Sequence, residues 1–277
     1  MTMNKNPDIQ KKLIKDYWLT KLSRTAEYSS LPGPFPQAGA GNSTCSRSFL
    51  SSLSFPLPPA AVDPIKTISK NNPVTEFIIN LAVWGILLYK YFNTPELWIV
   101  SPGLRENPEP DGGNTLLFFR LEISPGDSLK EILSNTRGEV LESFAHAVHN
   151  YGELKETLAG NFPGVDAFYR YGICDRRIHG ESGEFENVDL RLALEMQIGE
   201  GLEPRLEIKY DQRRYQEVFV RQLAAHFVRL LGDTRDNLDK QVVDMEILSP
   251  VEKRHIIEDF NDIDTSSRPV KTIPGIF

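Results

Sequence analysis

The sequence has few cysteines, no strong excess of one charge and no long hydrophobic run. Cys45 and Cys174 are the two cysteines among 277 residues, too few for a disulfide framework or a zinc ribbon, which favours a reducing compartment. The most apolar stretch covers only residues 77–89, shorter than the roughly 20 residues that cross a bilayer. No apolar signal-peptide core follows the charged residues 1–15. We therefore expect a cytoplasmic protein with no membrane partner.

Basic residues and phosphate-binding loops are also too few for nucleic acid or nucleotide chemistry. The 31 Lys and Arg residues are outnumbered by 38 Asp and Glu residues, which gives a formal net charge of −7. A nucleic-acid partner is therefore not expected. No glycine-rich loop of either standard spacing occurs, so no nucleotide and no other cofactor is expected. With 40% hydrophobic residues, the chain has enough apolar side chains to fold around a core.

Hydrophobic periodicity predicts helices at both ends and in the centre of the chain. Residues 7–22 form a short amphipathic pattern, with Ile9, Leu13 and Tyr17, and Trp18 beside them, on one face. A central helix that is apolar almost all round follows Asn72. A longer amphipathic helix begins at the capping pair Ser128 and Glu131. Further helices are expected over 151–158, 212–231 and 249–260.

Strand patterns occur between these helices. Residues 48–57 alternate weakly, whereas 97–100 and 114–123 have the aromatic-rich, apolar character of buried strands. Residues 190–198 and 206–211 alternate on either side of a Gly-Glu-Gly turn and predict a hairpin with one face on a core. The expected class is α/β, a two-layer α+β sandwich in which a mixed sheet packs on helices.

Several segments, taken in order, resemble the C-terminal lobe of the condensation domains of nonribosomal peptide synthetases. The letters DYWLTKL at 16–22 are similar to the Tyr-Trp element that follows the catalytic region of that family. Val74-Thr75 with LYKY at 88–91 is similar to its threonine-led helix. The letters NTLLFFR at 114–120 match its VNTLxLR strand, although the usual Gly-x-Phe-Val before it is replaced by Asp-Gly-Gly.

The resemblance continues to the end of the chain. The letters IKYD at 208–211 and HF at 226–227 are similar to a late strand and helix of the family, and residues 247–261 to its closing signature. The letters KTIPGIF at 271–277 resemble the connector that opens an adenylation domain. The resemblance implies an N-terminal helix over 1–22, a linker over 23–47, a lobe of the chloramphenicol-acetyltransferase-like superfamily over 48–260 and a connector over 261–277. Phe277 is then expected to be a boundary rather than a natural end.

The catalytic motif of the family is missing from the sequence. In condensation domains the acyl-transfer base is the second histidine of HHxxxDG, but no two of the five histidines here are adjacent. The later HQDxPFE motif should fall at 146–153, where the chain reads HAVHNYGE. No counterpart of the RDxSRxPLF element is found over 160–174. We therefore assign no catalytic, cofactor-binding or metal-binding residues.

Five histidine and cysteine positions are candidates to substitute for that chemistry. His146 and His149 have a spacing that can hold a metal, but no third ligand is near, so a solvated or capping pair is favoured. His226 is expected to be a partly buried structural residue. Cys174 lies beside Arg176 and Arg177, with His179 as the nearest histidine, and an inert cysteine is favoured.

Two further groups have open interpretations. Arg213, Arg214, Arg221 and Arg229 could form a basic face for an acidic partner or a phosphopantetheine arm, or a solvated surface, which is favoured. By resemblance, Asn114 and Thr115 would lie near the bottom of the acceptor tunnel. From the residues alone they are as easily a hydrogen-bonding pair at a strand end.

The resemblance and the missing motif together lead to three functional hypotheses. The first is a non-catalytic, condensation-like platform for an adjacent adenylation domain in antibiotic or other secondary-metabolite biosynthesis. The second is half of a split acyltransferase, completed by a separate lobe that carries HHxxxDG. The third is a docking module that receives an upstream synthetase or a phosphopantetheinylated carrier protein through the helix over 7–22.

Overall fold

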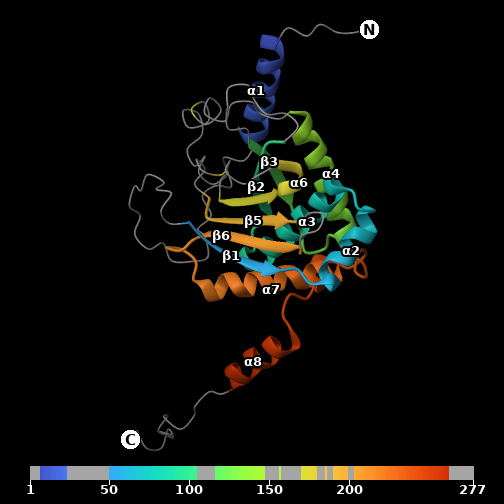
Figure 1. The fold of residues 1–277 in the computed structure, drawn as a ribbon, viewed down its shortest axis with the longest axis vertical. Coiled ribbons are helices and arrows are strands. Elements are labelled where there is room, and N and C mark those ends of the chain that lie inside the picture. Colours follow the sequence, from blue (N-terminus) through green and yellow to red (C-terminus); the bar gives the residue numbers. More distant parts are fainter. Residues whose placement is uncertain are drawn as a thin grey trace, which may run out of the picture. The chain divides into compact units, whose positions relative to one another are not determined.

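The computed structural model describes residues 7–23, 50–104, 116–146, 156, 170–179, 185, 190–198 and 203–261. The chain divides into two compact units, Met1–Met245 and Glu246–Phe277. The elements of the first unit are shown in Figure 1: α1 (Pro7–Ser23), β1 (Leu50–Pro56), α2 (Pro59–Ser69), α3 (Pro73–Phe92), β2 (Glu96–Pro102), β3 (Leu116–Glu122), α4 (Leu129–Ala145), β4 (Tyr171–Asp175), α6 (Arg176–His179), β5 (Leu192–Gln197), β6 (Arg205–Asp211), α7 (Glu217–Asp233) and a 3-10 turn at Val242–Asp244.

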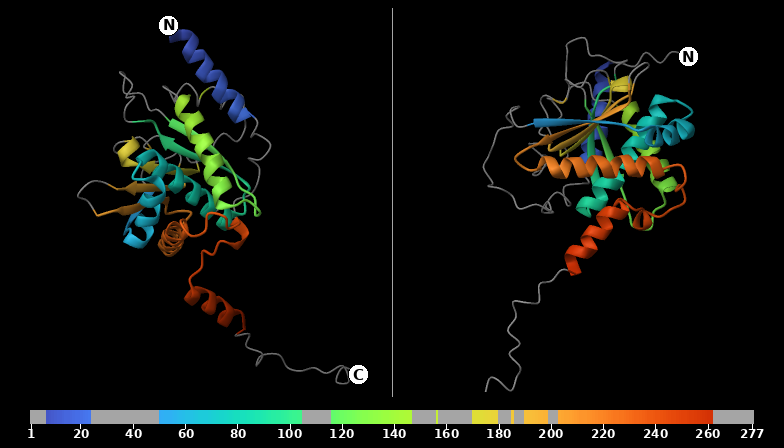
Figure 2. Two further views of the ribbon diagram at one scale, coloured as in Figure 1. Left: turned by 90° about the vertical axis from the view of Figure 1, so that its right-hand side faces the viewer. Right: turned by 60° about the horizontal axis from the view of Figure 1, so that its bottom comes forward.

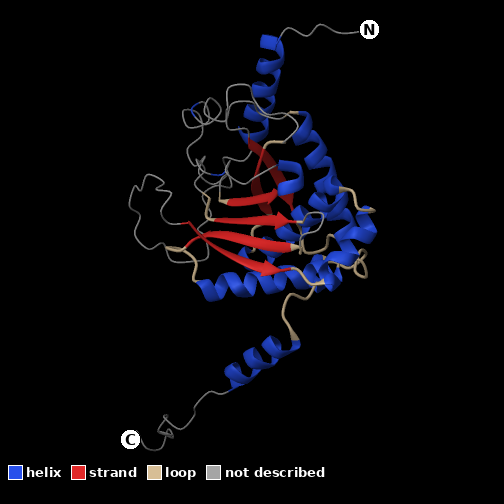
Figure 3. Cartoon of the chain, in the orientation of Figure 1, coloured by secondary structure: helices blue, strands red, loops and turns tan. Residues whose placement is uncertain are grey.

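A mixed six-stranded sheet forms the centre of this unit, with the order β1-β6-β5-β4-β2-β3 (Figure 3). β4 runs parallel to both of its neighbours, β5 and β2, and the other pairs are antiparallel. The predicted class of a mixed sheet packed on helices is therefore confirmed. All five predicted strands are found, and the hairpin is β5 and β6.

α3 is the central helix of the core. Asn72 caps it by accepting a hydrogen bond from the backbone N–H of Thr75 at 2.9 Å, and Pro73 occupies its first turn. The helix is longer than the apolar stretch that predicts it. It is long and apolar enough to cross a bilayer, but 72% of its most apolar window is buried within the protein. The burial assigns α3 to the core, as the sequence predicts.

The helices cover one face of the sheet. α3 and α7 contact each other and the sheet, α2 packs on α7, and α4 packs on α3 and on the edge strand β3. Figure 2 shows α7 running along this face. α4 begins with the predicted capping box, in which the Ser128 side chain accepts from the N–H of Glu131 and the Glu131 carboxylate accepts from the N–H of Ser128.

α1 covers part of the opposite face. Trp18 and Leu22 are fully buried, in one cluster with Trp98, Val100 and Phe118 of β2 and β3. The sequence predicts the helix and predicts its buried face in part: Trp18 lies on that face, but Leu13 is 60% exposed and Tyr17 is half-buried. The buried face is centred on Trp18 and Leu22, which are one helical turn apart and reach the sheet.

Two strands differ from expectation. β4 was not predicted, because Gly172 and Cys174 give it no alternating pattern. A side chain at Gly172 would put its Cβ 3.1 Å from the Cβ of Ala193, a tight contact, so the close approach of β4 and β5 favours glycine there. β5 was predicted to have one buried face, but Ala193 and Glu195 on its second face are buried as well. The helix α2 was also not predicted.

The second unit contains α8 (Pro250–Asn261), which matches the helix expected near the end of the chain. Ser249 and Glu252 form its predicted capping pair: the N–H of Ser249 donates to the Glu252 carboxylate at 2.7 Å, and the N–H of Glu252 donates to the Ser249 hydroxyl at 3.2 Å. The expectations for 23–47 (beyond Ser23), 151–158 (Glu156 aside), 262–277 and Cys45 lie outside the described residues.

Candidate functional site

Three of the described histidines, His146, His179 and His226, contact neighbouring side chains or backbone. His146 follows α4, and its ring stacks on Tyr17 of α1, with 3.9 Å between ring centroids. Its Nδ1 donates to the carbonyl oxygen of Glu142 at 2.9 Å. His226 is buried in α7, with its Nδ1 2.7 Å from the Tyr91 hydroxyl, as expected for a structural histidine. His149, the proposed metal partner of His146, lies outside the described residues.

His179 sits in the buried interior at the carboxyl end of β4. Its Nδ1 lies 3.0 Å from the backbone nitrogen and 3.1 Å from the carbonyl oxygen of Asp175, and its Nε2 lies 3.1 Å from the Ser101 hydroxyl. Burial lowers the pKa of His179 to about 4, and the hydrogen bond with the Asp175 backbone opposes this shift. The imidazole is therefore neutral near pH 7.

This neutral histidine gives the protein a specific acid sensitivity. In the unfolded chain a histidine titrates near pH 6.5, about 2.5 units above its folded value, so stability is complete above pH 6.5 and is lost as the pH falls toward 4. We expect His179 alone to cost about 3 kcal/mol of unfolding free energy across that interval. Urea unfolding at several pH values should show a shallower acid slope for His179→Gln than for the wild type. Equal slopes would contradict a neutral, buried His179.

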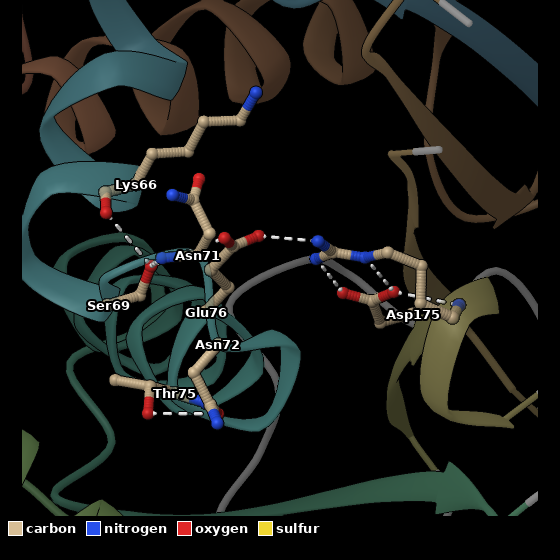
Figure 4. A network of polar contacts seen from close by, with 8 residues as sticks. Lys66, Ser69, Asn71, Asn72, Thr75, Glu76 and Asp175 are labelled. Carbon is tan, nitrogen blue, oxygen red and sulfur yellow. Dashed lines mark hydrogen bonds and ion pairs between the residues drawn. The ribbon is translucent and has the colours of Figure 1, made fainter. Parts of the chain in front are cut away.

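A charged network lies next to His179 and joins four elements, β4, α6, α3 and α2 (Figure 4). Arg177 of α6 holds Asp175 through Nε and Nη2 at 3.0 and 2.7 Å. Its Nη1 reaches Glu76 in the first turn of α3 at 2.6 Å. The other Glu76 oxygen accepts from the hydroxyl of Ser69 at the end of α2. Both carboxylates are buried, so Arg177 is the cation that neutralises them inside the protein.

Cys174 precedes this network and is buried. Arg177 binds the carboxylates of Asp175 and Glu76, and Arg176 binds that of Glu195 at 2.5 Å while also interacting electrostatically with Cys174. This arrangement supports the inert interpretation of Cys174 over an activated thiol.

The arginines considered as one basic face are separated by the structure. Arg213 and Arg214 precede α7, which begins at Glu217, and both contact Asp211, at 2.8 and 3.5 Å. Arg221 is exposed and pairs with Glu217 at 2.6 Å. A single helical face is therefore not formed, because the chain turns between Arg214 and α7. Asn114 and Thr115 lie outside the described residues.

A cleft of about 980 Å³ opens between α1, β3 and α4. In its wall, Lys21 of α1 pairs with Glu139 of α4 at 2.5 Å, and Glu139 also accepts the backbone N–H of Arg120 at 2.7 Å. The Ser143 hydroxyl donates to the backbone oxygen of Phe118 at 2.9 Å. Side chains of α4 thus satisfy backbone groups of β3, which is an edge strand of the sheet.

Tyr17 is the aromatic residue of that cleft. Burial, followed by the negative charges of Glu142 and Glu139, raises the pKa of Tyr17 well above its usual range. The phenol therefore stays protonated and stacks on His146. Within the described ranges, no group of three or more histidine, cysteine or acidic side chains could hold a metal ion.

No protein-family model matches the chain. Among curated proteins, it is 22% identical to gramicidin S synthase 2 of Brevibacillus brevis over 94% of its own length and 6% of that protein. It is 24% identical to bacitracin synthase 1 of Bacillus licheniformis, again over 94% of the chain and 5% of that protein. The chain thus spans about a twentieth of the length of these relatives.

Several solved structures share the fold of this chain. The X-domain in its complex with OxyB from teicoplanin biosynthesis gives a TM-score of 0.64 at 15% identity, over 85% of this chain and 56% of that one. The first condensation domain of the calcium-dependent antibiotic synthetase, with a substrate analogue, gives 0.62 at 13% identity, over 87% and 54%. A holo four-domain nonribosomal peptide synthetase gives 0.66 at 14%, over 91% and 21%. The chain therefore has a condensation-domain-like fold.

Proposed function

We propose that this chain is a condensation-domain-related, non-catalytic part of a cytoplasmic nonribosomal peptide synthetase, where it supports an adjacent adenylation domain in antibiotic biosynthesis. The observation that carries the proposal is that three histidine side chains contact other groups of the protein. The sequence has no HHxxxDG, and His146, His179 and His226 contact an aromatic ring, a buried serine and a tyrosine hydroxyl. A general base needs hydrogen-bond reach to its substrate, and none of these three contacts supplies it.

The test compares a module in which this chain precedes an adenylation domain with the same module lacking residues 1–260. We expect deletion to lower both the soluble yield and the amino-acid-dependent exchange of pyrophosphate into ATP per mole of enzyme, because a supporting surface is removed. The control restores residues 1–260 as a separate, co-expressed chain. If both yield and exchange are unchanged by deletion, the platform role is wrong.

A second candidate is half of a split acyltransferase. Its support is the coverage of the solved condensation domains, 54–59%, which is the share expected for one lobe with its flanking elements. This candidate requires a separate HHxxxDG-bearing lobe to bind the chain. Affinity purification of the tagged chain from its source cells should recover such a partner as a stable heteromer, and recovery of none would exclude the candidate.

The docking candidate needs a more selective test than removal of α1. Because Trp18 and Leu22 belong to the core, deletion of residues 7–22 would disturb the fold as well as any docking. Leu13 is exposed on the same helix. A Leu13→Asp variant would abolish transfer from an upstream carrier protein if α1 docks it, while leaving adenylation intact.

A further inference from the structure

Arginines from three separate segments meet at the end of the sheet where β4 and β5 begin. The backbone N–H of Arg191 donates to the carbonyl oxygen of Arg170 at 2.9 Å, and the N–H of Asp211 donates to that of Arg191 at 3.0 Å. The N–H of Arg214 then donates to the oxygen of Asp211 at 2.9 Å. These bonds bring Arg170, Arg191 and Arg214 to one edge, although they are far apart in the sequence.

Among the residues that the structure describes, the carboxylates at this edge do not balance the cations. Arg213 binds both carboxylate oxygens of Asp211, at 2.9 and 2.8 Å, and Arg214 lies 3.5 Å from the same carboxylate. Among the described residues, Arg170 and Arg191 have no carboxylate partner, and Nε of Arg170 is buried without a hydrogen bond. Burial, and then the nearby charges of Arg170 and Arg214, lower the pKa of Arg191. The three guanidinium groups therefore act on one another.

Two phenols complete the cluster. Tyr171 begins β4 and Tyr215 follows the turn after β6, and each interacts electrostatically with Arg170 and Arg191. Burial raises the pKa of both, most strongly that of Tyr171, despite the nearby arginines. Both hydroxyls therefore remain protonated and can donate hydrogen bonds to an anion.

A half-buried cation that has like charges as neighbours destabilises a fold unless an anion binds to it. The cluster also occurs in a chain whose net charge is −7, so a generally basic surface does not account for it. We propose that Arg170, Arg191 and Arg214, with the hydroxyls of Tyr171 and Tyr215, bind a phosphate group. Guanidinium forks match phosphate oxygens in pairs, and several of them together suit a dianion better than a single carboxylate.

The test measures phosphate binding by the whole chain. Inorganic phosphate should raise the melting temperature of the wild type and give a calorimetric binding isotherm, because a ligand that binds only the folded state stabilises it. Arg191→Gln should weaken binding by at least roughly tenfold, the loss of one charged hydrogen-bond partner. The phosphate affinity of Arg191→Lys should lie between those of the wild type and Arg191→Gln, because lysine keeps the positive charge but lacks the guanidinium fork. Arg221→Gln, outside the cluster, is the matched control and should bind as the wild type does.

A second readout separates binding from a structural role. Without phosphate, Arg191→Gln should be at least as stable as the wild type, since it removes repulsion and breaks no ion pair with any residue in the described part of the chain. A structural arginine would instead give a destabilised variant. A parallel titration with 4′-phosphopantetheine identifies the source: tighter binding than inorganic phosphate assigns the site to a carrier's prosthetic arm, and equal or weaker binding assigns it to a free phosphate compound. Absence of phosphate binding, or equal binding by Arg191→Gln, would overturn the proposal.

Discussion

Replacing Trp18 with alanine is expected to lower the unfolding free energy by about 3–5 kcal/mol, the range for truncating a large buried aromatic residue. Trp18 has no exposed surface and meets Phe118 edge-on, with 5.4 Å between ring centroids. Its indole nitrogen also donates to the backbone oxygen of His146 at 2.6 Å. The substitution therefore removes the main contact of α1 with the sheet and one of its polar links to the end of α4.

Urea denaturation measures this loss, and limited proteolysis of α1 locates it. Leu13→Ala is the matched control on the same helix, because an exposed leucine should change the unfolding free energy by only about 0.5 kcal/mol. Equal stabilities for the two variants would mean that α1 is not an integral part of the fold. The interpretation of the cleft between α1 and α4 would then fail with it.

Arg177→Met is expected to have an effect of similar size for an electrostatic reason. It would leave the buried carboxylates of Glu76 and Asp175 without their shared cation, and breaking a buried ion pair typically costs about 3–5 kcal/mol. Adding Glu76→Gln to this variant should recover part of the loss, because one of the two uncompensated charges is removed.

The matched control for the buried network is an exposed ion pair. Arg221→Met breaks the exposed contact with Glu217 and should cost only about 0–1 kcal/mol. Chemical denaturation of the three variants at pH 7 compares them directly. If Arg177→Met is no more destabilised than Arg221→Met, the ion network does not join α3 to the end of β4.

Local sequence patterns predicted the helices and strands that have capping residues or hydrophobic alternation of their own. The Asn72-Pro73 start of α3, the Ser128–Glu131 capping box and the alternation of β6 are such signals, and all three appear in the structure. β4 has none, because it is short and its Gly172 is favoured by the close approach of Ala193, which is distant in the sequence. The buried face of α1 was predicted only in part, because Trp18 reaches residues of β2 and β3 that sequence periodicity does not locate.

The functional surfaces were harder to predict than the fold. The sequence shows that HHxxxDG is absent, but not that His146 stacks on Tyr17 or that His179 is buried. The arginine cluster was missed because Arg170 and Arg191 become neighbours only through pairing at the starts of β4 and β5. The adjacent arginines Arg213 and Arg214 instead suggested a basic face on the segment that includes α7.

The most direct test of the central claim is an amide-bond assay with the whole chain. It would be incubated with an aminoacyl-carrier donor and an aminoacyl-carrier acceptor, and the product would be followed by mass spectrometry. A condensation-like fold without a placed base should give no dipeptide above the rate without protein, and His146→Ala should behave identically. Dipeptide formation that depends on the chain and is lost in His146→Ala would contradict the account.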